Sequence, residues 1–311
     1  DITDALVPGN NVITVCVDNS IEQTSRWYTG TGINRNVWLH RLSPLHILRH
    51  GLRIDAGGDG SLKLTTETSL PCSVLYTVFA PSGEIVFSIK ADSGMEMKTG
   101  IYQPELWSPD SPQLYRCRVS ISDNEGAVLD KLEERFGFRS VEFSPGQGFI
   151  FNGEKLLLRG VNLHEDLCAL GTALHKDGIR RRYQNLKAWG VNAIRLAHHP
   201  FAPEWYELAD EMGFLVFAEA FDNWNGQYCG YQVDFELTWR RDLTEFIISR
   251  RNHPCIFIWS VGNEICDQQL RGQHDFGVHQ YRAMRDEVRR LDPSRQVTCA
   301  LFPARKDGVI Y

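Results

Sequence analysis

The stretch Phe257-Ile258-Trp259-Ser260-Val261-Gly262-Asn263-Glu264 decides the fold of this chain. Its apolar first half predicts a buried strand, which stops abruptly at Gly262 and presents an amide and a carboxylic acid side by side. Burying such a polar pair costs free energy unless another group uses it. The stretch therefore predicts a functional site at the carboxyl end of a buried strand.

Strands and helices alternate on both sides of this stretch, from about residue 150 onward. Apolar runs predict strands at 156–161, 191–196, 214–219, 255–260 and 297–302. Between them, the spacing of apolar residues predicts helices at 176–189, 203–212, 234–251 and 275–291. Buried strands that alternate with helices are typical of βαβ units on a parallel sheet.

Polar and titratable residues gather where these predicted strands end. They are Asn162 and His164 after the first strand, Arg195, His198 and His199 after the second, Glu219, Asp222 and Asn223 after the third, and Asn263 and Glu264 after the fourth. The turn after the first strand lacks the glycines of a dinucleotide-binding fold. Polar residues at the carboxyl ends of successive strands are typical of a (β/α)8 TIM barrel.

The residues before about 150 follow a different pattern. They predict short strands at 11–19, 37–42, 61–67, 72–79, 84–90 and 114–122. Turn signals such as Gly57-Gly58-Asp59-Gly60 and Pro81-Ser82-Gly83 separate these strands. Short strands with turns at this spacing predict β-sandwiches.

The composition argues against several classes of function. The net charge is −6 and no basic tract occurs, so we expect no nucleic-acid partner. The eight cysteines form no C-x-x-C pair, which argues against a zinc ribbon and a thioredoxin-like site. No apolar run reaches the ~18 residues of a membrane span, so we expect none.

Four further motifs complete the pattern. They are Ser25-Arg26-Trp27-Tyr28-Thr29-Gly30, Leu106-Trp107-Ser108-Pro109, Phe136-Gly137-Phe138-Arg139 and Leu158-Arg159-Gly160-Val161-Asn162-Leu163-His164. Together with the strand-end residues they resemble the family 2 glycoside hydrolases, most of all the bacterial β-galactosidases. The resemblance implies the end of a sugar-binding jelly roll at 1–44, an immunoglobulin-like β-sandwich at 45–141, and the first part of a TIM-barrel catalytic domain, about five strands, at 142–311.

The resemblance implies a retaining glycosidase that cleaves terminal β-galactosides by double displacement. Such enzymes hold two carboxylic groups ~5–5.5 Å apart. Glu264 would be the acid/base, and Asn263 would bind the sugar 2-hydroxyl; the alternative for Glu264 is a cap on the next helix. A buried Arg195 needs an anionic partner. By resemblance that partner is the nucleophilic carboxylate, and the alternative is a structural salt bridge.

Four more residues are expected to bind substrate by the same resemblance. His198, rather than His199, would point into the sugar pocket, and His164 would also contact the sugar; for each the alternative is a structural histidine satisfied by the protein. Asp222 would hold sugar hydroxyls, with a turn residue as the alternative. Trp224 would form an aromatic wall, with a core residue as the alternative.

No cofactor and no metal are expected at this site. Some β-galactosidases hold magnesium through a Glu and a His after the third strand, and in this sequence those positions fall near Asn223 and Asn225. Amide side chains are poor substitutes for such ligands. The histidine pair His198-His199 shows no recognised metal spacing with Asp222.

The family's nucleophilic Glu follows the seventh barrel strand, and no carboxylate in this sequence matches that role. We therefore expect a fragment lacking both ends of a longer hydrolase, inactive by itself. The alternatives are a β-glucuronidase or β-mannosidase of the same family, or a non-catalytic carbohydrate-binding protein. The sequence leaves open whether the protein is a homo-oligomer, and whether it resides in the bacterial periplasm or cytoplasm.

Overall fold

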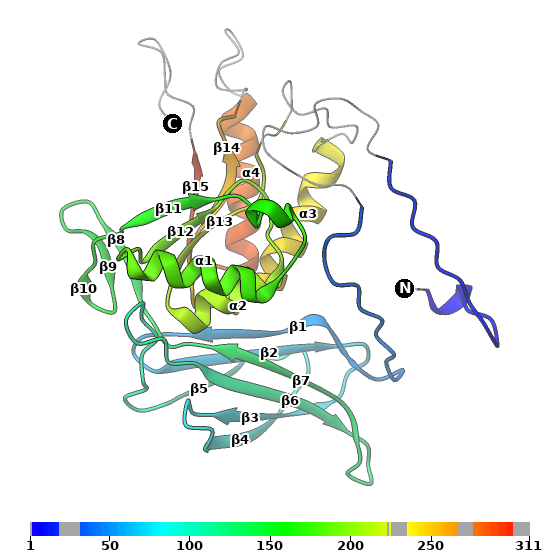
Figure 1. The fold of residues 1–311 in the computed structure, drawn as a ribbon. Helices are drawn as coiled ribbons and strands as arrows, with labels where there is room; N and C mark the ends of the chain where they lie inside the picture. The colour runs from blue at the N-terminus through cyan, green and yellow to red at the C-terminus, as the bar shows by residue number, and fades with distance from the viewer. Residues whose placement is uncertain (1, 19–31, 223, 225–234, 266–275, 301–311) are drawn as a thin grey trace.

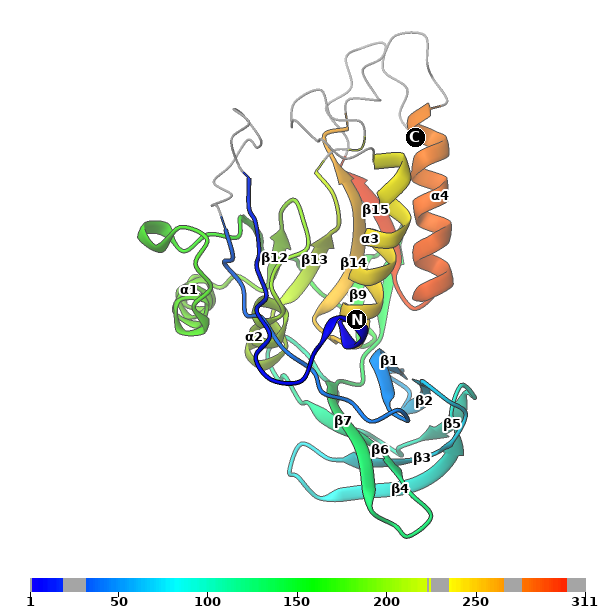
Figure 2. The same ribbon diagram turned by 90° about the vertical axis from the view of Figure 1, so that its right-hand side faces the viewer.

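The computed structural model describes residues 2–18, 32–222, 224, 235–265 and 276–300. An antiparallel β-sandwich lies below a parallel sheet in both views of the ribbon (Figures 1 and 2). Four α-helices accompany the parallel sheet, so the described chain divides into an all-β part followed by an alternating β/α part.

The sandwich consists of a three-stranded and a four-stranded antiparallel sheet. The first sheet has the order β1 (Ile47–Ala56), β2 (Ser61–Thr68), β5 (Met97–Gly100), and the second β4 (Ile85–Asp92), β3 (Ser73–Phe79), β6 (Tyr115–Ser122), β7 (Val128–Phe136). Alternate residues of β6 are buried, among them Cys117 and Val119, as a strand with one face on a core requires. The inward residues of the two sheets form one hydrophobic cluster.

A small antiparallel sheet links the sandwich to the parallel sheet. Its strands are β8 (Val141–Ser144), β9 (Gly148–Phe151) and β10 (Glu154–Lys155). Phe149 and Phe151 of β9 are buried and belong to the hydrophobic core of the β/α part. This connecting sheet was absent from the sequence-based prediction.

The parallel sheet contains five strands in the order of the sequence. They are β11 (Gly160–Leu163), β12 (Ala193–Leu196), β13 (Leu215–Glu219), β14 (Ile256–Asn263) and β15 (Gln296–Ala300). The helices between them are α1 (Lys176–Ala188), α2 (Pro203–Met212), α3 (Phe235–Arg250) and α4 (Phe276–Leu291). Since every neighbouring pair is parallel, the carboxyl ends of all five strands meet at one edge.

Helix α2 illustrates how the sequence sets an element and its packing. Pro203 starts the helix, where its missing N–H costs nothing, and Gly213 ends it in the left-handed region with φ 72°. A Cβ atom at Gly213 would lie 2.3 Å from the carbonyl oxygen of Pro109. The glycine therefore also permits the close approach of a sandwich loop to the β/α part.

Trp107 joins the two parts of the structure. Its side chain is fully buried, and its indole Nε1 donates a hydrogen bond of 2.9 Å to the carbonyl oxygen of Asp210 in α2. Its backbone carbonyl accepts a 3.1 Å hydrogen bond from Asn152 Nδ2. This sandwich residue thus belongs to the core of the β/α part.

The predicted β-sandwich and partial TIM barrel are confirmed, and the four helices and all parallel strands except the first lie close to their predicted ranges. Two predicted strands are wrong: the described residues 11–18 and 37–42 form no strand. Their apolar side chains are exposed, 89% for Val12 and 76% for Trp38. A strand requires a neighbour to pair its backbone, and no described strand pairs with these residues.

The first strand of the parallel sheet begins later than predicted. The apolar run at 156–161 suggested a start at Leu156, whereas β11 starts at Gly160. Leu157 is 72% exposed, so this part of the run connects two sheets instead of pairing within one.

Among the described residues, no helix combines the length and apolar character that crossing a bilayer requires.

Candidate active site

Glu219 is the centre of a polar cluster at the carboxyl edge of the parallel sheet. It ends β13, and its side chain is fully buried. Its oxygens accept hydrogen bonds from Arg195 Nη2 (2.9 Å to each), His198 Nδ1 (2.5 Å) and Ser260 Oγ (2.7 Å). The register places Glu219 beside Ser260, so three neighbouring strands supply the cluster. A buried carboxylate is stabilised by such paired charge and hydrogen bonds.

Both ends of the Asn263 amide are held in place. Its Oδ1 accepts a 2.6 Å hydrogen bond from Arg195 Nη2, and its Nδ2 donates one of 2.9 Å to Asp222 Oδ1. The backbone N–H of Asn263 donates a further 2.9 Å hydrogen bond to the carbonyl of Asp222. These contacts fix the orientation of a nearly buried amide. An Asn amide has two donor hydrogens and two acceptor lone pairs. After these side-chain contacts, one amide hydrogen and one oxygen lone pair remain.

Glu264 follows directly and turns the chain sharply. Its φ of 45° lies in the left-handed region, which is uncommon for a residue with a side chain. Its backbone N–H donates a 2.9 Å hydrogen bond to the carbonyl of Ala300 at the end of β15. Unusual backbone conformations of this kind concentrate at functional sites. The half-buried carboxyl group of Glu264 therefore projects from a backbone held by the adjacent strand.

His164 and His198 form a pair beside this cluster. Their ring centroids are 5.4 Å apart and their planes make an angle of 75°. His164 Nδ1 donates a 3.0 Å hydrogen bond to the carbonyl of Ala197, the residue before His198. Burial, followed by the proximity of His198, lowers the pKa of His164. A neutral His164 that donates through Nδ1 presents Nε2 as an acceptor.

The structure separates His198 from His199. His198 contacts Glu219, whereas His199 Nδ1 lies 3.3 Å from the carbonyl of Pro200 and 3.8 Å from Glu165 Oε2. The His199 ring packs against Phe201 at a centroid distance of 5.1 Å. His198 therefore belongs to the cluster around Glu219, and His199 lies in the loop behind it.

Trp224 lies in the core, which was the alternative prediction for it. Its side chain is only 2% exposed, and its Nε1 donates a 2.8 Å hydrogen bond to the carbonyl of Val261. A Cβ atom at Gly262 would lie 2.8 Å from the same Nε1. The indole therefore supports the backbone under Gly262 and Asn263, and an aromatic wall for a ligand would need a more exposed face.

Arg195 forms a salt bridge with the buried carboxylate of Glu219. A structural salt bridge was one of the two roles that the sequence predicted for Arg195. All three of its side-chain hydrogen bonds use Nη2. Its Nε is buried and has no hydrogen-bond partner among the described residues. A buried donor without a partner is costly, and the guanidinium fork retains capacity for another acceptor.

The sequence analysis missed the role of Glu219, although it noted the residue at a strand end. The available signal was Arg195, a charged residue in an apolar strand that needs an anionic neighbour. Glu219 ends the next strand along the chain, and adjacent parallel strands place such residues side by side. Ser260, the third contact of Glu219, carried no distinguishing signal.

A possible metal-binding group lies elsewhere, next to the start of β14. Asp210, His253 and Cys255 bring their donor atoms within 4.8 Å of one another. However, the two Asp210 oxygens already accept hydrogen bonds from His253 Nδ1 (2.5 Å) and Cys255 N (3.0 Å). Burial raises the pKa of Cys255, whereas a metal needs the thiolate. The group fits a hydrogen-bonded contact better than a metal site.

Asn223 and Asn225, on which the expected absence of magnesium depended, lie outside the described residues.

Two family descriptions match most of this chain. Residues 144–303 match the TIM barrel domain of the glycosyl hydrolases family 2, and residues 52–139 match a second domain of the same family. The chain belongs to glycosyl hydrolase family 2. The predicted family is therefore confirmed.

The chain is similar to proteins whose names give different substrates. It is 36% identical over 278 residues to a β-galactosidase of Bacteroides ovatus, covering 83% of this chain and 32% of that protein. It is 34% identical over 315 residues to a putative β-glucuronidase of Formosa agariphila, covering 96% of this chain and 29% of that protein. The chain therefore spans about a third of the length of these relatives.

Solved structures show the same fold. The crystal structure of a β-glycosidase from Bacteroides vulgatus superposes with a TM-score of 0.84 at 35% identity, covering 91% of this chain and 37% of that chain. A β-glucuronidase of Bacteroides uniformis superposes with a TM-score of 0.70 at 31% identity, covering 82% and 33%.

Proposed function

We propose that this chain carries the acid/base half of a retaining β-glycosidase site, with Glu264 as the proton donor. The observation that supports this most is the fixed amide of Asn263 directly before a Glu264 whose backbone is turned at a strand end. Glu264 protonates the glycosidic oxygen as its bond to the anomeric carbon breaks. It then accepts a proton from the water that releases the sugar.

Asn263 is proposed to bind the sugar 2-hydroxyl. Arg195 and Asp222 hold its amide, so its remaining donor and acceptor are presented in a fixed direction. A contact to the 2-hydroxyl strengthens in the oxocarbenium-like transition state, and a preorganised dipole gains from that without reorientation. Asp222 then acts through Asn263, since its own carboxylate is only 2% exposed.

His164 and His198 are proposed to bind other sugar hydroxyls. Each uses Nδ1 to contact the protein, His164 to the carbonyl of Ala197 and His198 to Glu219. We assign the sugar contact to Nε2, the ring nitrogen opposite the one with which each histidine contacts the protein. Edge-to-face packing of the two rings keeps the two positions fixed relative to each other.

The nucleophile is proposed to be a carboxylate that residues 1–311 do not supply. Glu219 is buried under four hydrogen bonds, and Asp222 is held against Asn263, so neither is free to attack a carbon. Arg195, whose side chain is 19% exposed, is the cation suited to orient the missing group. We therefore expect no turnover from residues 1–311 alone.

Residues 45–141 and 142–311 are proposed as the sandwich and catalytic domains, and 1–44 as the end of a jelly roll.

The substrate is proposed to be a terminal β-galactoside, which the name of the Bacteroides ovatus relative supports. The names of the Formosa agariphila relative and the Bacteroides uniformis structure favour a β-glucuronide as the second candidate. Rates of hydrolysis of 4-nitrophenyl β-galactoside, β-glucuronide and β-mannoside by the intact protein that contains this chain distinguish the three sugars. Binding without hydrolysis of any of them would indicate a carbohydrate-binding protein.

Glu264→Gln tests the acid/base role. We expect the rate on an alkyl β-galactoside, whose leaving group needs protonation, to fall by about 10²–10⁴-fold. The rate of glycosyl transfer from an activated aryl galactoside should fall much less. Glu154→Gln, an exposed position in β10, is the control and should match the parent. Equal losses on both leaving groups would contradict the role of Glu264 as proton donor.

A further inference from the structure

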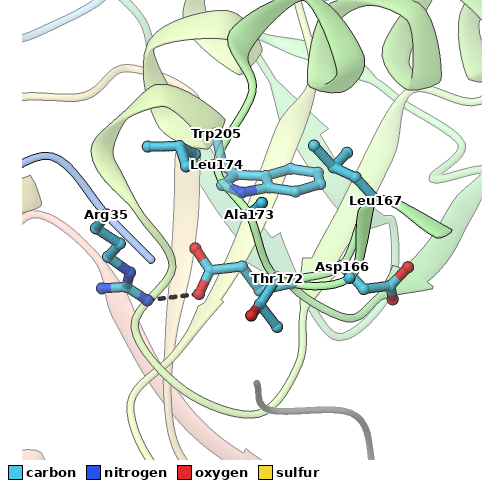
Figure 3. Close-up of a pocket in the computed structure, with 9 residues that line it drawn as sticks. Arg35, Asp166, Leu167, Thr172, Ala173, Leu174 and Trp205 are labelled. Atoms are coloured by element: carbon cyan, nitrogen blue, oxygen red, sulfur yellow. Dashed lines mark hydrogen bonds and ion pairs between the residues drawn. The ribbon is translucent and has the colours of Figure 1, made fainter. Parts of the chain in front are cut away.

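Residues 34–36, which precede the sandwich, contact two loops at the carboxyl edge of the parallel sheet. Arg35 Nη2 donates hydrogen bonds of 2.5 Å to Glu165 Oε2 and 2.9 Å to the carbonyl of Pro200. Figure 3 shows Arg35 at one side of a small pocket, over which Trp205 and Leu167 lie. The arginine therefore joins the loop after β11 to the loop after β12.

Glu165, the partner of Arg35, also contacts the loop after β12. It is 9% exposed, and its Oε1 accepts a 2.6 Å hydrogen bond from the backbone N–H of Ala202. Its Oε2 lies 3.8 Å from His199 Nδ1. One buried carboxylate thus bridges its own loop, the loop after β12 and Arg35. A buried carboxylate with these contacts depends on its cation, because an unpaired charge in this position is costly.

The neighbours of Arg35 hold the same two loops. Asn34 Nδ2 donates to the carbonyl of Thr172, and the Leu174 N–H donates to the carbonyl of Asn34, at 3.4 and 3.3 Å. Asn36 Nδ2 donates a 2.9 Å hydrogen bond to Glu204 Oε1 at the start of α2. Arg35 is therefore placed by contacts on both sides of it along the chain.

The two bridged loops carry the histidines of the candidate site. His164 directly precedes Glu165, and His198 lies two residues before Pro200. His164 Nδ1 donates a hydrogen bond to the carbonyl of Ala197, in the loop after β12. Any change in the spacing of the loops therefore changes the distance between His164 and His198.

We propose that Arg35 and Glu165 are positioning residues, which hold the loops of His164 and His198 at the spacing that the sugar site requires. The proposal rests on the proposed function for its kinetic consequence. Neither side chain touches the reacting atoms. Their ion pair couples a segment before the sandwich to the loops that carry the histidines, so the segment belongs to the active-site architecture.

Kinetics of the intact protein that contains this chain test the consequence. Arg35→Met removes the charge and both hydrogen bonds at similar length, and small misplacements of binding groups cost large factors in rate. We expect kcat/KM on 4-nitrophenyl β-galactoside to fall on the order of tenfold, with Arg35→Lys recovering part of the loss. Glu165→Gln should cause a similar loss, and the double variant should lose little more than either single variant, because both break one contact.

The matched control is Arg180→Met. Arg180 pairs with Glu211 at 3.1 Å, and its side chain is 40% exposed, equal to that of Arg35. It lies on α1, away from the histidine loops. Its loss should leave kcat/KM unchanged. Equal melting temperatures of all variants would separate misplacement from unfolding.

A second measurement, an NMR titration of residues 1–311, does not depend on enzymatic activity. Burial lowers the pKa of His199, while Glu165 raises it and Arg35 lowers it. In histidine-labelled NMR titrations, Arg35→Met should raise the His199 pKa, Glu165→Gln should lower it further, and the His164 and His198 resonances should shift in both variants. Arg180→Met should leave all three unchanged.

The outcomes separate this proposal from the proposed function. If the parent protein hydrolyses no β-glycoside, the proposed function fails, and the NMR titrations still decide whether the pair holds the loops. If the parent is active and Arg35→Met matches it, the positioning role is overturned. Unchanged His164 and His198 resonances in both variants would overturn it whatever the kinetics show.

Discussion

The side chains of Arg195 and Asn263 meet at 2.6 Å, between Nη2 of one and Oδ1 of the other. The same Arg195 nitrogen donates to both oxygens of Glu219, so the amide is aligned by the guanidinium that neutralises the buried carboxylate. The contact therefore links the Arg195–Glu219 charge pair to the orientation of Asn263, the residue proposed to bind the sugar 2-hydroxyl.

Asn263→Ala is expected to discriminate between substrates with and without a 2-hydroxyl. The variant loses the proposed contact, so the intact protein should lose about 10²–10³-fold in kcat on a β-galactoside, the range found for one preorganised transition-state donor. On the 2-deoxy analogue, which lacks the contact, variant and parent should differ little. Rates on the two substrates measure this, and an equal loss on both would show that Asn263 only positions Arg195.

Glu219→Gln is expected to lower the free energy of unfolding of residues 1–311 by about 3–5 kcal/mol, because it leaves Arg195 without its buried anion. Denaturant unfolding measures the change. Glu133→Gln is the matched control: Glu133 also pairs with two arginines, but on the solvent face of β7, where its side chain is 34% exposed. That loss should stay below about 1 kcal/mol. Similar losses in the two variants would contradict the central place of Glu219.

His50 is expected to make stability depend on pH between about 4 and 6.5. Burial, with the charge of Arg49, lowers its pKa from 6.5 to about 4. Within that window the unfolded chain binds the proton and the folded chain does not, so the free energy of unfolding rises with pH and levels off above 6.5. His50 has a φ of 56°, which Asn tolerates, so His50→Asn should flatten this part of the curve. Parallel curves for parent and variant, from urea unfolding at each pH, would refute the expectation.

The sequence was most informative where the signal is local. The helix ends at Pro203 and Gly213 and the polar pair Asn263-Glu264 depend on neighbouring residues only, and the structure has these elements where the pattern predicted them. A polar residue that ends an apolar strand can be recognised without knowing which strand lies beside it. The catalytic and binding roles of these residues remain proposals.

The contacts that the sequence could not supply depend on pairing between distant segments. Glu219 became the centre of the cluster because β12, β13 and β14 lie in register, which no single strand encodes. The alternating residues 11–18 resemble a strand, yet alternation does not provide a partner. The Arg35–Glu165 contact spans 130 residues and had no local signal.

Trp107 has a consequence for how the protein can be divided. It comes from the sandwich, but its ring fills the core beneath α2 and its indole N–H satisfies a carbonyl of that helix. Cutting the chain between the two parts would leave an indole-sized hole in one piece and an exposed indole on the other. The sandwich is accordingly an integral structural support of the barrel, and the two should melt together as a single cooperative unit.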